Sequence, residues 1–273
     1  MHQSCEGQTR TGLRVELLQG FELTNRGQPV RLQLSAQRVV AFVALQRRAV
    51  ERLYVAGRLW PDSSERHASA SLRTVLWRLR QTNVPIVDAN STRIGLNGAV
   101  HVDVHEIAAR AEAAITNSSA TPPGSCRLLL PAGELLADWY DDWVVIERER
   151  IRHLQLRALE TLCRQLTAEG RYAEAVEAGD AAVSAEPLRE SAHRAVIEAF
   201  LAEGNTSDAL RQYGVCREVL ARHLGLAPSE SLQQIVGRYT SGDASVTQPI
   251  NDGAISATPT ICESEARGLD APA

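Results

Sequence analysis

Two copies of one short pattern, 34 residues apart, constrain the fold of this chain more than any other feature of its sequence. The first copy runs from Gly170 to Ala175 and the second from Gly204 to Ala209. An offset of 34 residues is the period of tetratricopeptide repeats, in which pairs of antiparallel helices stack side by side. The glycines are placed to end helices, and proline follows each repeat, as the architecture requires. We therefore expect an all-α, tetratricopeptide-like domain whose surface suits protein contacts.

The first hundred residues follow a different pattern, in which short strands and helices succeed one another. Residues 13–24 alternate apolar and polar side chains as half-buried strands do, and a turn at residues 25–27 follows. Ser35 is the expected N-cap of the first helix, and residues 88–92 are the expected turn of a β-hairpin. The pattern predicts strands at 13–24 and 29–32, helices at 35–48, 53–60 and 65–81, and a hairpin at 85–96. These are the parts of a winged helix-turn-helix.

Length and charge divide the chain in two. A chain of 273 residues exceeds one compact domain. We expect a flexible N-terminus (1–12), a winged helix-turn-helix (13–103), the helical repeat domain (104–240) and a disordered tail (241–273). Residues 1–103 carry 14 Arg against 8 Asp and Glu, a balance of +6, whereas residues 104–240 carry 14 against 20, a balance of −6. A basic half joined to an acidic half predicts nucleic acid at one end only.

Several other classes of protein are disfavoured by the sequence. The five cysteines are scattered without a C-x-x-C pair, and we interpret them as reduced thiols of a cytoplasmic protein. The chain lacks both a 20-residue apolar run and a signal peptide, so we expect no membrane contact. We find none of the usual nucleophile, zinc or nucleotide motifs, and expect no enzyme activity, cofactor or metal. His101 and His105 lie four residues apart, but an ordinary linker explains them better than a metal site.

The helix predicted at residues 65–81 carries the features of a recognition helix. Its apolar stripe includes Leu72, Leu76 and Leu79, and the opposite face would enter a major groove. On that face arginine contacts guanine edges or phosphates, threonine contacts a base methyl group or a phosphate, and small Ala70 allows close approach. Arg78 and Arg80 flank the face and are expected to hold phosphates. The expected DNA-binding residues of this helix are Arg66, Ser69, Ala70, Arg73, Thr74, Trp77, Arg78, Arg80 and Gln81.

Three of these interpretations have competing explanations. An arginine-rich helix face is often merely solvated, but Trp77 on the side opposite the core argues against this, unless it packs on the hairpin. Thr92 and Arg93 at the hairpin tip suit a wing that meets the DNA backbone or minor groove, although an exposed turn arginine often has no role. Residues 138–143 concentrate aromatic and acidic side chains, which we interpret as packing aromatics rather than a sugar site.

With these motifs in view, the chain resembles the Streptomyces antibiotic regulatory protein family from about Leu13 to Tyr239. Members of that family join a response-regulator-type winged helix to a bacterial transcriptional activator domain of tetratricopeptide repeats. The order and spacing of the motifs carry the resemblance. The motifs are residues 34–38 (LSAQR), 59–62 (LWPD), 70–80 (ASLRTVLWRLR), 135–143 (LLADWYDDW), 147–148 (ER), 186–190 (EPLRE), 209–213 (ALRQY) and 224–229 (LGLAPS).

The resemblance implies a regulator of antibiotic or other secondary-metabolite gene clusters. Such a protein activates transcription by binding direct repeats in double-stranded promoter DNA, as a homodimer, and by helping RNA polymerase holoenzyme engage the promoter. Larger members append an ATPase, and without a Walker motif this chain is expected to lack nucleotide-driven control. A repressor with the same domains, or a protein-interaction scaffold whose winged helix has lost DNA binding, remains the alternative; the +6 balance of the first half argues against the scaffold.

Overall fold

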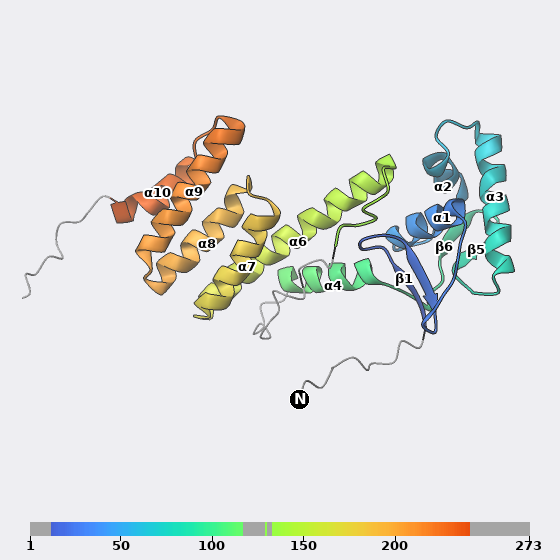
Figure 1. The fold of residues 1–273 in the computed structure, drawn as a ribbon, viewed down its shortest axis with the longest axis horizontal. Helices are drawn as coiled ribbons and strands as arrows, with labels where there is room; N and C mark the ends of the chain where they lie inside the picture. Colours follow the sequence, from blue (N-terminus) through green and yellow to red (C-terminus); the bar gives the residue numbers. More distant parts are fainter. Residues whose placement is uncertain (1–11, 117–128, 130–132, 241–273) are drawn as a thin grey trace, which may run out of the picture.

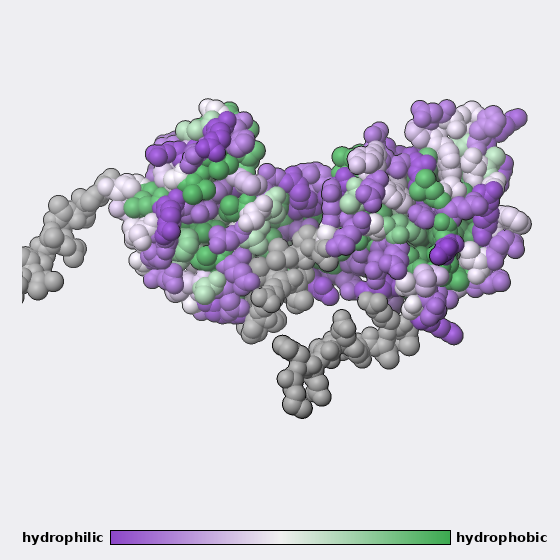
Figure 2. All heavy atoms as spheres, viewed as in Figure 1, coloured by the Kyte–Doolittle hydropathy of each residue, from purple (hydrophilic) through white to green (hydrophobic). Residues whose placement is uncertain are grey.

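The computed structural model describes residues 12–116, 129 and 133–240. Residues 1–11 of the predicted flexible N-terminus and the predicted disordered tail (241–273) lie outside the described residues. The chain forms a winged helix-turn-helix followed by a stack of helices, and α6 (Asp142–Ala168) runs from one part into the other (Figure 1). The surface in Figure 2 is largely hydrophilic along the outer edge of the winged helix. The fold class predicted from the sequence is confirmed.

A four-stranded sheet opens the winged helix. Strands β1 (Leu13–Glu16), β2 (Glu22–Asn25) and β3 (Gln28–Pro29) are antiparallel, and β7 (Val100–Val102) pairs with β1 in parallel. The prediction of a strand at 29–32 was wrong in its bounds: β3 spans Gln28–Pro29, and beyond it the N–H of Val30 makes one more bond to β2, donating to the carbonyl of Leu23 at 2.8 Å. The prediction of a linker around His101 was also wrong: the residue lies in β7. Strands this short do not show a recognisable alternation of apolar and polar residues.

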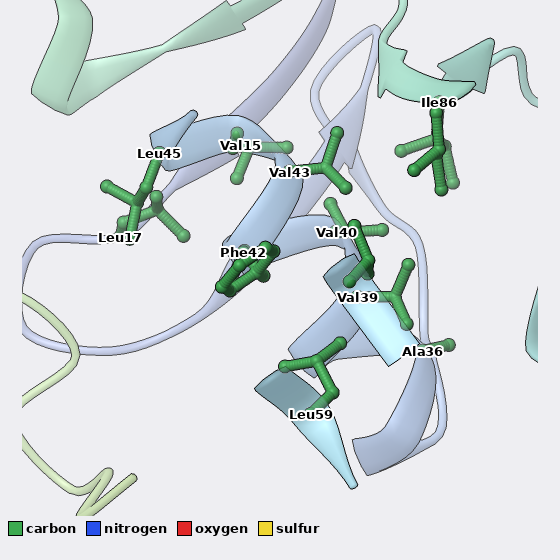
Figure 3. Close-up of a cluster of buried hydrophobic side chains, with 14 of the residues drawn as sticks. Val15, Leu17, Ala36, Val39, Val40, Phe42, Val43, Leu45, Leu59 and Ile86 are labelled. Atoms are coloured by element: carbon green, nitrogen blue, oxygen red, sulfur yellow. The ribbon is translucent and has the colours of Figure 1, made fainter. Parts of the chain in front are cut away.

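Three helices pack against this sheet around one apolar core. Helices α1 (Leu34–Leu45), α2 (Arg52–Leu59) and α3 (Glu65–Gln81) all contribute buried side chains to it. Figure 3 shows side chains of α1, such as Phe42 and Val40, clustered with Leu59 of α2 and Val15 of β1. The predicted Ser35 cap was wrong, because the N–H groups of Ala36 and Gln37 donate to the carbonyl of Gln33 and the helix begins one residue earlier. The bounds predicted for the third helix are confirmed.

The predicted hairpin is part of a second, three-stranded sheet. Strand β6 (Arg93–Leu96) lies between β5 (Val87–Ala89) and β4 (Val50–Glu51) and is antiparallel to both. The turn is shorter than predicted, because the side-chain oxygen of Asn90 accepts hydrogen bonds from the N–H groups of Thr92 and Arg93 at 2.9 and 2.7 Å. Residues 88 and 89 therefore belong to the strand rather than to the turn.

The second half consists of helices, as predicted. They are α4 (Asp103–Thr116), α6, α7 (Tyr172–Ala185), α8 (Glu190–Glu203), α9 (Thr206–Leu224) and α10 (Glu230–Thr240). Gly170 and Gly204 follow α6 and α8 with φ of 74° and 89°, the left-handed conformation that glycine adopts without strain. Helices α7 and α8 approach closely at Gly179, where a Cβ would lie 2.4 Å from a methyl carbon of Val196. Among the described residues, no helix combines the length and apolar character of a membrane span.

One hydrophobic core extends across the junction of the two halves. Trp143 at the start of α6 is 4% exposed and meets Phe42 of α1 edge to face, with 5.2 Å between ring centroids. Trp139 stacks on Phe21 at 6.2 Å. The interpretation of residues 138–143 as packing aromatics is confirmed for Trp139 and Trp143 but wrong for Tyr140, which is 86% exposed. These aromatic contacts hold α6 against the winged helix.

Backbone hydrogen bonds reinforce this junction. The N–H of Gln19, in the loop after β1, donates to the carbonyl of Glu134 at 2.7 Å, and the N–H of Leu136 donates to the carbonyl of Leu17 at 2.7 Å. The carboxylate of Asp103 accepts from the N–H groups of Leu17 and Leu18 at 2.9 and 3.0 Å. The segment that precedes α6 is thus paired with the N-terminal sheet.

Candidate nucleic-acid interface

Helix α3 lies at the outer edge of the molecule, on the side of the winged helix away from the repeat stack (Figure 1). Ser64 caps it by accepting a hydrogen bond from the N–H of His67. Its apolar stripe, which includes Leu72, Leu76 and Leu79, is buried against the core. Burial of one stripe leaves the opposite face of the helix free to meet a ligand.

The structure places the predicted α3 residues on this outward side. Ser69 and Ala70 are half-buried, and Trp77 is 62% exposed, so this side chain does not pack on the hairpin. The hydroxyl of Thr74 donates to the carbonyl of Ala70 at 3.1 Å, which orients its methyl group. The exposed residues of the predicted set are Arg66, Arg73, Thr74, Trp77, Arg78, Arg80 and Gln81.

The hairpin tip and the N-terminal half of α3 border one surface hollow of about 420 Å³. Ser69 and Arg73 of α3 line it together with Thr92 of the tip. Arg52, at the start of α2, lines the same hollow and donates from its guanidinium to the carbonyl of Asn90 at 2.9 Å. Sequence reasoning missed Arg52, because no spacing or motif links it to α3; the two-residue strand β4 brings it there.

The remaining predicted residues are not among those that line this hollow. Arg80 and Gln81 occupy the other end of α3, at about 1.5 Å of rise per residue roughly 18 Å along the axis from Ser69. Arg78 donates to the side-chain oxygen of Gln33 at 2.6 Å, so a contact within the protein directs its guanidinium toward the start of α1. Arg93 is exposed beside Thr92 at the hairpin tip. The predicted set therefore extends along the whole helix and reaches the hairpin.

The arginines of this surface differ from most of those in the second half. In the part of the chain that the structure describes, the five predicted arginines of α3 and the hairpin form no salt bridge with a carboxylate. In contrast, Arg150, Arg171, Arg189 and Arg222 are each paired with a glutamate. Helix α3 carries four arginines against one acidic residue, Glu65. Unpaired cations on an exposed helix attract an anionic partner.

The other candidate sites have structural roles. His105 approaches the carbonyl oxygen of Ala44 with its Nε2 at 2.7 Å, and burial lowers the pKa of His105 below its ordinary value. The thiols of Cys163 and Cys216 are buried, which raises the pKa of Cys163 to about 12. Among the described residues, no group of three His, Cys, Asp or Glu side chains is arranged to hold a metal ion.

Comparison with protein families identifies the second half. The model of the bacterial transcriptional activator domain matches residues 102–238. Regulatory protein AfsR of Streptomyces coelicolor is 29% identical over 212 residues, which cover 74% of this chain and 21% of that protein. Regulatory protein AfsR of Streptomyces griseus is 27% identical over 252 residues, which cover 88% of this chain and 25% of that protein. The chain thus spans about a quarter or less of the length of these relatives.

A solved structure shares the fold. Mycobacterium tuberculosis EmbR, in complex with a low-affinity phosphopeptide, superimposes with a TM-score of 0.67 at 22% sequence identity. The match covers 86% of this chain and 66% of EmbR. The similarity includes both the winged helix and the helical repeats, since neither part alone makes up that share of the chain.

Proposed function

Since the chain belongs to the bacterial transcriptional activator domain family and is a regulator of the Streptomyces antibiotic regulatory protein type, we propose that it binds promoter DNA in a sequence-specific manner through α3 and the β5–β6 hairpin. The observation that carries the proposal is the row of exposed arginines on α3 without carboxylate partners among the described residues. A recognition helix needs such groups for guanine edges and phosphates.

The proposal assigns each part of this surface a role. Arg66, Ala70, Arg73 and Trp77 face the major groove, where arginine reads guanine and the indole packs on base methyl groups or sugars. Thr92 and Arg93 meet the neighbouring backbone or minor groove. Arg52, Ser69, Thr74, Arg78, Arg80 and Gln81 position the helix through phosphate contacts, with Thr74 and Gln81 also within reach of bases.

We further propose a division of labour between residues 13–103 and residues 104–240. The acidic second half would be repelled by DNA and is free to contact RNA polymerase holoenzyme or a second copy of the chain on adjacent direct repeats. The target in this proposal is a promoter of an antibiotic or other secondary-metabolite gene cluster, which the regulator activates in the cytoplasm. A promoter–reporter assay with and without the protein separates activation from repression.

The experiment that tests DNA binding is selection of genomic fragments by the full-length protein at two salt concentrations. We expect enrichment of a direct repeat upstream of a biosynthetic operon, and binding that weakens as salt rises because counterions are released. The matched comparison uses two triple variants, one that lacks three arginines of the first half and one that lacks three arginines of the second half. Arg66→Ala/Arg73→Ala/Arg80→Ala abolishes enrichment, whereas Arg157→Ala/Arg217→Ala/Arg238→Ala, on exposed residues of the second half, preserves it. Absence of enrichment by the wild-type protein at both salts favours the scaffold alternative.

A further inference from the structure

A cavity of about 430 Å³ lies where the winged helix meets α6. We call it the junction cavity. Its volume falls in the range of about 300 to 1,000 Å³ that is usual for small-molecule pockets. Both halves of the protein supply its apolar walls. The walls consist of Leu18, Leu135, Ile151, Leu156, Leu159 and Ala185.

The charged side chains at this cavity are already neutralised. Arg148 pairs with Glu134 at 2.8 Å and also donates to the backbone carbonyl oxygens of Leu135 and Leu136 at 3.0 and 2.9 Å. Arg152 pairs with Glu149 at 2.7 Å and with Glu186. Each charged residue among the described lining residues is therefore in an ion pair, and an ionic ligand would have to break one of these pairs.

Gln155 supplies a neutral polar group in the same wall. Gln155 is 7% exposed, and its amide nitrogen lies 3.4 Å from the carbonyl oxygen of Leu129. That distance is beyond the usual range of about 2.7 to 3.2 Å for a strong N–H···O bond. The amide is thus held weakly and can donate to an acceptor placed inside the cavity.

We propose that the junction cavity binds a small, neutral, predominantly apolar molecule with a hydrogen-bond acceptor that faces Gln155. Apolar walls favour the burial of an apolar surface, the paired rim charges disfavour an ion, and the amide fixes the orientation. Such a ligand would contact Leu18 of the winged helix and α6 at once and so stabilise the junction between them. The inference does not depend on DNA binding by α3.

The first test uses N-phenyl-1-naphthylamine, a neutral apolar fluorophore, with the full-length protein. We expect a saturable rise in fluorescence. Ala185 is exposed at the end of α7 and lines the cavity, so Ala185→Trp fills the space without entering the core and weakens binding at least about tenfold. The control is Ala202→Trp, at an exposed alanine on α8, which leaves binding unchanged. Equal binding by the two variants, or no saturable rise with the wild type, overturns the proposal.

A second test addresses the charge of the ligand and needs no variant. The anionic probe 8-anilinonaphthalene-1-sulfonate should bind at least about tenfold more weakly than the neutral probe, and equal affinity contradicts a neutral site. Benzophenone, itself neutral and apolar, is then cross-linked by light to the wild-type protein and mapped by mass spectrometry. Adducts within residues 133–135 and 148–159 support the junction cavity. Adducts confined to other segments refute it.

Discussion

Replacement of Arg73 by alanine tests the DNA-binding surface at its centre. Arg73 is exposed and, among the described residues, forms no salt bridge, so its removal should change the free energy of unfolding by no more than about 0.5 kcal/mol. A bidentate contact to a guanine edge contributes about 1 to 3 kcal/mol of discrimination. We therefore expect Arg73→Ala to raise Kd for the selected DNA by about 5- to 150-fold while the protein remains folded.

The assay is fluorescence anisotropy at fixed salt with two duplexes of equal length, one selected and one random. Arg217→Ala is the matched control, because Arg217 is an exposed arginine of α9 that forms no salt bridge within the described residues. A loss confined to the selected duplex supports base reading by Arg73. An equal loss on both duplexes assigns Arg73 to a phosphate, and unchanged binding to both refutes its role in the interface.

Three further predictions concern the fold, each measured by urea unfolding. Trp143→Ala removes a buried ring at the junction and should cost about 3 to 5 kcal/mol, whereas Tyr140→Ala, at an exposed ring, should cost less than about 0.5 kcal/mol. Gly179→Ala forces a Cβ into α8 and should destabilise by about 1 to 3 kcal/mol, whereas Gly214→Ala, in open space on α9, should stabilise by about 0.5 to 1 kcal/mol. Because the pKa of His105 is lowered in the folded state, the contribution of His105 to the free energy of unfolding is lost as pH falls below about 6.5. His105→Gln should therefore lose less stability than the wild type between about pH 7.5 and pH 5.5. Equal changes in the free energy of unfolding within the tryptophan–tyrosine pair or within the glycine pair would contradict these predictions. So would a pH dependence of stability that His105→Gln leaves unchanged.

The sequence alone predicts the long elements well. The bounds of α3 follow from a cap, an apolar stripe of period 3.6 and a polar end, all of which lie within the helix itself. The glycines and prolines of the repeats likewise indicate where helices end, because they depend only on the local backbone conformation. Features set by neighbouring residues in sequence were therefore recoverable.

Features set by long-range contacts were not recoverable. Strands β4 and β7 have two and three residues, and they become strands because β6 and β1 lie beside them. The same contacts bring Arg52 to the hairpin tip, and Gln33, 45 residues away in sequence, to Arg78. No local sequence pattern indicates these long-range contacts. Arg52 was therefore missed, and the hydrogen bond from Arg78 to Gln33 was not predicted.

DNA binding by α3 and the hairpin is tested most directly by photo-cross-linking of the protein to the selected duplex carrying 5-iodouracil, followed by peptide mapping. We expect cross-linked peptides from residues 66–81, with Trp77 as the principal site, and from the hairpin tip at residues 92–93. Cross-links confined to residues 104–240, or none at a protein concentration that saturates the duplex, would contradict the assignment of DNA binding to α3 and the hairpin.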